Sequence, residues 1–236
     1  MSSAPMTIHH HPDDELLVAY AAGELDEAWS LVIATHTALC PVCRSDVHMA
    51  EAVGAALLED MPAAEMAVLD DAALARTLAL AELADEETPP DASSAASASG
   101  ETDAPGGIPI LPQPLRDYAG GDADTLKWRR LGAGAFQVPL VTGRRGAPTA
   151  RLLRFPAGTA VPEHGHDGME MTLVLAGSYA DAGAPFARGD VDVNDAEVAH
   201  RPVAGAGPDC ICLTVTERPL RFRGLIARLA QPFIGV

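Results

Sequence analysis

Hydrophobic and polar positions follow two different periods along the chain. Through residue 83, apolar side chains recur every three or four positions, which is the period of an α-helix. Pro12 followed by three acidic residues predicts the start of a helix that ends at Gly23. The same pattern predicts further helices over residues 26–39, 41–60 and 63–83. We therefore expect the first third of the chain to be helical.

Beyond residue 107 the apolar runs are short, rich in β-branched side chains and separated by Gly, Pro or Asp. Several short strands at such spacing indicate an all-β sandwich or barrel. The predicted strands are residues 136–141, 151–155, 170–175, 191–193, 210–215 and 220–222.

A polar segment separates these two regions. In residues 85–107 the only apolar side chains are those of alanine and proline, so little there offsets the entropy lost on ordering. We predict an α+β multidomain protein. Its parts are a helical domain over residues 1–84, a flexible acidic linker over 85–107 and an all-β domain over 108–236.

Charge is unevenly distributed. The chain has 16 basic and 33 acidic residues, and residues 1–83 hold 14 acidic side chains against only Arg44 and Arg76. This balance argues against direct binding of nucleic acid, which needs clustered Lys and Arg. An acidic helical region suits a basic protein partner, although acidity that serves solubility alone is an open alternative.

The sequence shows neither a membrane helix nor a secretory signal. No run approaches the roughly eighteen uncharged apolar residues of a membrane span, and the N-terminus has no basic patch followed by an apolar stretch. We therefore expect a cytoplasmic protein, in which thiols stay free or bind metal.

A first metal motif joins two predicted helices. His36 and Cys40 lie one helical turn apart, and Cys43 follows about one turn later. Zinc in structural sites favours four N or S ligands in a tetrahedron, so a fourth ligand must come from elsewhere. In the run of three histidines at 9–11, His11 lies nearest the start of the first helix. Such a site would join that helix to the junction of the next two.

Other interpretations of these residues exist. A CxxC pair also suits a dithiol switch without metal, or plain packing. His9 and His10 are expected to be exposed, and His48 is expected to lie on a helix surface.

A second constellation fits the first cupin motif, G(x)5HxH(x)3E(x)6G, from Gly158 to Gly177. His164 and His166 would share one face of a strand because side chains alternate, and Glu170 begins the next strand. The second cupin motif keeps its spacing up to His200, while Asp195, Glu197 and Ala204 replace its usual Pro, Gly and Asn. Three imidazoles and one carboxylate suit several divalent metals, of which we favour zinc; a cupin that has lost its metal is the alternative.

The pair Cys210 and Cys212 would share one face of a strand, near enough to oxidise although strained as a direct disulfide. Two small buried hydrophobic side chains are the alternative. Such a pair favours a sensor over an enzyme. The competing hypothesis is a metal-dependent dioxygenase or isomerase with an accessory zinc domain.

Residues 7–47 resemble the N-terminal zinc-binding domain of the ChrR family of anti-sigma factors, whose hallmark is an upstream His joined to HxxxCxxC. The phrases VPEHGHDGMEMTLVL, DCICL and LRF resemble the C-terminal cupin of that family, so the resemblance covers residues 7–58 and 108–236. It implies a non-enzymatic regulator whose helices block the access of a sigma factor to core RNA polymerase. It also implies that the cupin is linked to release of the sigma factor under singlet oxygen or organic peroxide stress. The zinc ligands that it implies are His11, His36, Cys40 and Cys43.

Overall fold

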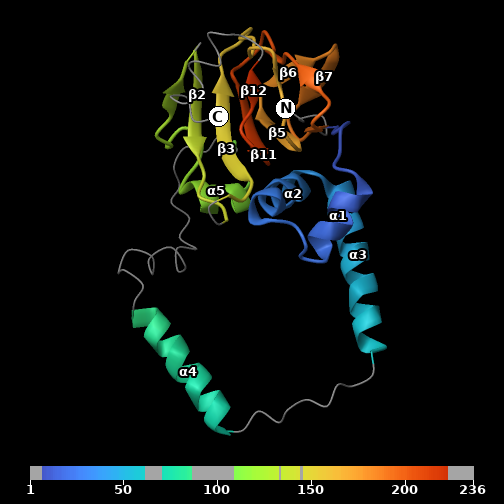
Figure 1. The fold of residues 1–236 in the computed structure, drawn as a ribbon, viewed down its shortest axis with the longest axis vertical. Helices are drawn as coiled ribbons and strands as arrows, with labels where there is room; N and C mark the ends of the chain where they lie inside the picture. The colour runs from blue at the N-terminus through green and yellow to red at the C-terminus, as the bar shows by residue number, and fades with distance from the viewer. Residues whose placement is uncertain (1–6, 62–70, 87–108, 133, 144–145, 223–236) are drawn as a thin grey trace, which may run out of the picture. The chain divides into compact units, whose positions relative to one another are not determined.

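The N-terminal region is helical, as predicted (Figure 1). The structure is a computed structural model, which describes residues 7–61, 71–86, 109–132, 134–143 and 146–222. The helices of this region are α1 (Asp14–Ala21), α2 (Glu27–Leu39), α3 (Pro41–Glu59) and α4 (Asp71–Glu86). The predicted start of the fourth helix, over residues 63–70, and the predicted linker from residue 87 onward lie outside the described residues.

Local sequence signals explain where these helices begin and end. The side chain of Asp13 caps α1 by accepting a hydrogen bond from the Leu16 amide at 2.9 Å. Gly23 has a φ of 71°, a left-handed conformation that stops the chain from continuing as a helix. Cys40 has extended backbone between α2 and α3, because the residue before a proline disfavours the helical region. Pro41 then opens α3.

The C-terminal region is rich in β-structure, which confirms the predicted fold class. Its largest sheet is antiparallel throughout. Each of the six predicted strands corresponds to an observed one, five of them in this sheet and the sixth, residues 220–222, in a smaller one. In sheet order the strands are β1 (Arg129–Leu131), β2 (Ala135–Pro139), β3 (Thr149–Phe155), β11 (Cys210–Thr216), β5 (Glu170–Ala176) and β8 (Val191–Asn194).

Two smaller sheets and one helix complete the described part of this region, and most of these elements were not predicted. The sheets are β10 (Val203–Ala204), β6 (Ser178–Asp181) and β7 (Ala184–Ala187), then β12 (Arg221–Phe222), β4 (His164–Gly165) and β9 (Ala199–His200). The helix is α5 (Gln113–Ala119), which ends at Gly120. Segments this short contain too few residues to show a hydrophobic period.

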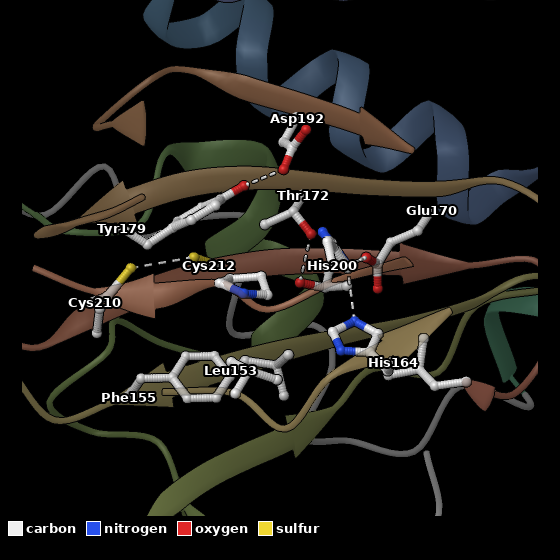
Figure 2. Close-up of a pocket in the computed structure, with 15 residues that line it drawn as sticks. Leu153, Phe155, His164, Glu170, Thr172, Tyr179, Asp192, His200, Cys210 and Cys212 are labelled. Carbon is white, nitrogen blue, oxygen red and sulfur yellow. Dashed lines mark hydrogen bonds and ion pairs between the residues drawn. The ribbon is translucent and has the colours of Figure 1, made fainter. Parts of the chain in front are cut away.

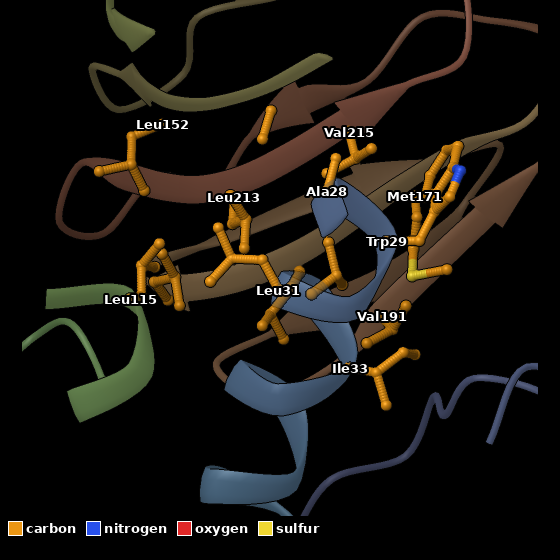
Figure 3. Packing of buried hydrophobic residues seen from close by; sticks show 14 of the residues in the cluster. Ala28, Trp29, Leu31, Ile33, Leu115, Leu152, Met171, Val191, Leu213 and Val215 are labelled. Atoms are coloured by element: carbon orange, nitrogen blue, oxygen red, sulfur yellow. The ribbon is translucent and has the colours of Figure 1, made fainter. Parts of the chain in front are cut away.

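Strand β11 lies in the middle of the large sheet, and all seven of its residues are buried. Its side chains alternate between two environments. Cys210, Cys212 and Thr214 line a pocket inside the β-rich region (Figure 2). Leu213 and Val215 belong instead to the apolar core on the opposite face (Figure 3).

Helix α2 packs against that opposite face and contacts α5, β5 and β11. Leu31 of α2 lies close to Leu213 and Leu115 in this core (Figure 3). The described residues of Met1–Ala56 and Pro109–Val236 form one compact unit, and those of Leu57–Ile108 form a second. The domain boundaries expected from the sequence remain a prediction, to which the structure adds a core shared by α2 and the sheet. Among the described helices, none has the length and apolar character that crossing a membrane requires.

Candidate metal centres

The four side chains predicted as an N-terminal metal site meet in the structure. The ligand atoms of His11, His36, Cys40 and Cys43 all lie within 4.8 Å of one another. The Nδ1 atom of His11 is 3.5 Å from the Cys40 sulfur and 3.2 Å from the Cys43 sulfur. The segment before α1 supplies His11, the last turn of α2 supplies His36, and the α2–α3 junction supplies both thiols.

Burial sets the protonation of two members of this cluster, His36 and Cys43. His36, Cys40 and Cys43 are almost completely buried. Burial lowers the pKa of His36 to about 4, so its imidazole is neutral, which is the form that binds metal. Burial and the adjacent Cys40 raise the pKa of Cys43 to about 12, so the thiol keeps its proton unless a cation displaces it.

An unpaired nitrogen shows that these residues fit a metal. The Nε2 atom of His36 is buried and has no hydrogen-bond partner within the described structure. Its Nδ1 atom lies 2.9 Å from the carbonyl oxygen of Gly189, which accepts the Nδ1–H hydrogen bond of the neutral ring. The lone pair is therefore on Nε2, in the cluster. Two thiols and two imidazoles in this arrangement suit the closed tetrahedral site of zinc.

The four residues of the predicted cupin site, His164, His166, Glu170 and His200, also converge. Figure 2 shows three of them, His164, Glu170 and His200. The Nε2 atom of His200 is 2.9 Å from that of His164 and 3.1 Å from that of His166. A carboxylate oxygen of Glu170 lies 3.5 Å from the His166 Nε2 and 3.6 Å from the His200 Nε2. All four side chains are buried.

The hydrogen bonds around this second cluster also fit a cation. The Nδ1 of His164 is 2.9 Å from the carbonyl oxygen of Pro162, and the Nδ1 of His200 is 2.6 Å from a carboxylate oxygen of Asp181. When both Nδ1 atoms donate, the two facing Nε2 atoms each carry a lone pair, an arrangement that a bound metal stabilises. Burial lowers the pKa of both His164 and His166 and so favours the neutral form that binds metal.

The pocket beside this cluster has polar residues that no sequence motif indicates. It is a cavity of about 70 Å³, bounded on one side by His164, Glu170 and His200. The hydroxyl of Tyr179 donates a hydrogen bond to Asp192 at 2.8 Å on the wall of the pocket (Figure 2). Strand alternation placed Asp192 on one face of its strand, but only the fold shows which face borders the pocket.

Cys210 and Cys212 lie on the wall of the same pocket, and their sulfur atoms are 3.5 Å apart (Figure 2). Both are free and buried. The hydrogen bond with Cys210, together with burial, raises the pKa of Cys212 well above its usual value. Cys212 therefore stays a thiol, on the wall of the pocket that His164, Glu170 and His200 also line.

The exposure of the remaining histidines agrees with the prediction for His48 and His9 but not for His10. His48 is exposed on α3, as predicted, and lies 3.1 Å from Glu51. His9 is exposed, as predicted. The expectation that His10 is exposed is wrong, because its half-buried ring packs against Phe186 with 4.4 Å between ring centroids.

Comparison with known proteins agrees with this picture. The family model of the ChrR cupin-like domain matches residues 117–219. The anti-sigma-E factor ChrR of Cereibacter sphaeroides is 43% identical over 98% of this chain and all of that protein. In the crystal structure of Rhodobacter sphaeroides SigE in complex with the anti-sigma ChrR, one chain is 40% identical, with a TM-score of 0.69, over 89% of this chain and 99% of that one. The chain therefore belongs to the ChrR family of anti-sigma factors.

Proposed function

We propose that this protein is a cytoplasmic anti-sigma factor, which binds and inhibits an extracytoplasmic-function-type sigma factor through residues 1–84. The observation that carries the proposal is the similarity, over almost the whole chain, to a protein named as an anti-sigma factor. A related chain has also been crystallised with SigE. That relative is named as an anti-sigma factor, which is a regulatory protein, and this confirms the expectation that the chain is not an enzyme despite its cupin-like region.

An exposed apolar row on α3 supports a protein partner. Val42, Met49, Val53 and Leu57 are each more than half exposed. Spacings of seven, four and four residues place them along one side of the helix. Large apolar side chains gathered on one side of a helix mark a surface that a partner covers. The acidic balance of residues 1–83 suits a partner that itself carries a basic, nucleic-acid-binding surface.

In this proposal, zinc bound by His11, His36, Cys40 and Cys43 stabilises the N-terminal helices. A structural zinc ion supplies folding free energy by joining distant ligands. Here it would join the segment before α1 to the α2–α3 junction, from which the apolar row of α3 begins. His164, His166, Glu170 and His200 would hold a divalent metal, for which zinc is our first choice.

The cupin pocket would serve as the sensor, with singlet oxygen or organic peroxide as the signal. For a peroxide, the redox candidates are Cys210 and Cys212, whose sulfur atoms lie 3.5 Å apart. Their two thiols lose two electrons and two protons as an S–S bond forms. The O–O bond of the hydroperoxide breaks, and an alcohol and water leave. A new bond in the central strand β11 would alter the sheet on which α2 packs.

Copurification tests the inhibitory half of the proposal. The full chain is co-expressed with a candidate sigma factor, and stable complex is measured by size exclusion. The double variant Met49→Asp/Val53→Asp is expected to lose the complex, because burial of such side chains in an interface contributes about 1–4 kcal/mol each. Ala55→Asp, on the opposite side of α3, is the matched control. A complex that survives the double variant would exclude the α3 surface, and a wild-type chain that binds no sigma factor would refute the proposal.

Oxidant treatment of the purified complex tests the sensory half. Cumene hydroperoxide is expected to release the sigma factor from the wild-type complex. The Cys210→Ser/Cys212→Ser variant is expected to stay bound, because its hydroxyls cannot form a disulfide. Thr172→Ser changes another side chain of the same pocket and serves as the control. Release from the double-serine variant at the wild-type rate would exclude the cysteine pair.

A further inference from the structure

The turn that leads into β8 contacts the N-terminal metal-ligand cluster directly. Residues 189–191 belong to the β-rich region, while the cluster belongs to the helical region. Three consecutive residues of this turn make hydrogen bonds with the segments that carry His11 and His36. The β-rich region therefore contacts the helical region through several consecutive residues, not through a single hydrogen bond.

Gly189 orients His36. Its carbonyl oxygen accepts the hydrogen bond from the His36 Nδ1 at 2.9 Å, inside the buried core. Gly189 has a φ of 92°, a conformation that residues with a Cβ rarely adopt, so this turn requires glycine. A carbonyl partner on one ring nitrogen determines both the tautomer and the orientation of a histidine ligand.

Asp190 and Val191 hold the segment next to His11. One carboxylate oxygen of Asp190 accepts hydrogen bonds from the amides of His9 at 2.7 Å and His10 at 3.0 Å. The Val191 amide donates to the His10 carbonyl at 3.0 Å. Asp190 is only 2% exposed, so these bonds are shielded from water. Hydrogen bonds to both the amide and the carbonyl of His10 thus attach the segment immediately before His11 to the β-rich region.

We propose that residues 189–191 form an outer shell of the N-terminal zinc site, so that the β-rich region helps to retain a metal whose ligands all come from the helical region. The inference rests on the zinc assignment of the proposed function. It makes Asp190 a positioning residue, which acts on His11 through the backbone. Strand β8 begins at Val191 and includes Asp192 on the wall of the cupin pocket, so only a few residues of the chain separate the two candidate metal sites here.

Asp190 also stabilises its own turn, because its second carboxylate oxygen accepts a hydrogen bond from the Ala187 amide at 2.8 Å. A test must therefore separate metal retention from folding. The His9→Pro variant deletes one amide donor to Asp190 and leaves the β-rich region unchanged. His9→Ala keeps that amide and is the matched control. Asp195→Ala, at an exposed position, is the control for Asp190→Ala.

The experiment measures cobalt release from the full chain. Cobalt bound to cysteine gives thiolate-to-metal absorption bands that report the N-terminal cluster alone, and a chelator in excess makes their decay a dissociation rate. Asp190→Ala is expected to release cobalt about 10–100-fold faster than wild type, the typical effect of losing an outer-shell partner. His9→Pro is expected to accelerate release at least severalfold, while both controls keep the wild-type rate.

Each outcome decides a separate point. Thiolate bands that decay at the wild-type rate in His9→Pro and in folded Asp190→Ala overturn the inference and leave the zinc assignment intact. If Asp190→Ala does not fold, His9→Pro decides alone. An equal loss of Mn²⁺ affinity at the cupin cluster would show a general structural defect and also overturn the inference. Absence of thiolate bands in the wild-type protein overturns the zinc assignment itself, and the inference with it.

Discussion

Replacement of Asp181 is expected to weaken metal binding at the cupin cluster without removing any ligand. Its carboxylate is 2.6 Å from the Nδ1 of His200, and the two side chains are 10% and 5% exposed. Charge-assisted hydrogen bonds are about twice as strong as neutral ones, which contribute about 0.5–1.5 kcal/mol. Asp181→Asn keeps an acceptor and loses the charge, so a loss of about 1.4 kcal/mol, or about tenfold in affinity, is expected. Asp181→Ala removes the bond and should approach a loss of about 100-fold.

Titration with Mn²⁺, followed by electron paramagnetic resonance of the free ion, measures this effect. The protein is first loaded with one equivalent of zinc, because soft thiolates select zinc while imidazole and carboxylate ligands also accept manganese. Asp195→Asn, an exposed aspartate on the chain leading to His200, is the matched control. Wild-type affinity in both Asp181 variants, with normal unfolding curves, would refute the role of Asp181 in orienting His200.

Three further outcomes are expected. Leu213→Ala, in the fully buried core beneath α2, should lower the free energy of unfolding by about 2–5 kcal/mol in a urea titration, and a loss below about 1 kcal/mol would show that the site collapses. Burial raises the pKa of Asp122, but hydrogen bonds from the amides of Leu111, Ala123 and Ile110 outweigh it and leave the pKa lowered. The stabilisation that the ionised Asp122 contributes is therefore complete above about pH 4 and is lost as the pH falls through the lower pKa of the folded state. Asp122→Asn should flatten this acid-side pH dependence of the urea midpoint. An unchanged slope would contradict the argument. Cys43→Ser should retain less zinc than wild type after dialysis against a chelator, measured by elemental analysis, and equal retention would contradict the assigned ligand set.

Most members of the two candidate metal clusters could be predicted from the sequence because their spacing is local. An i, i+4 separation places His36 and Cys40 one turn apart in a helix, whatever the helix packs against. The HxH spacing and the following Glu170 likewise place three candidate cupin ligands within one short stretch of the chain. The fold class was also predictable, since helical and strand periods are properties of short windows.

The sequence of α2 does carry a signal that this helix is buried on several sides. Its buried side chains include Trp29, Leu31, Val32 and Ile33, which point in several directions around the helix. A helix that is apolar on all sides is covered on more than one face. That pattern predicts a second packing partner for α2, although it does not identify the sheet formed by β5 and β11.

The partners that orient the ligands could not be predicted. Gly189 acts through a backbone carbonyl and Asp190 through an acceptor for backbone amides, so neither contact depends on a recognisable motif. Asp181 resembles any other aspartate until β6 is placed beside His200. The same holds for His10, whose burial depends on contact with Phe186, about 175 residues later in the chain.

By itself the sequence determined the helical and β-rich regions, the residues of the two candidate metal clusters and the resemblance to a family, because each rests on short motifs or recognisable phrases. Only the tertiary structure decided that α2 packs on the sheet, that residues 189–191 contact the N-terminal cluster, and that the cysteine pair shares a pocket with the cupin ligands. Those contacts join segments up to about 180 residues apart, and the packing that selects them is a property of the whole folded chain.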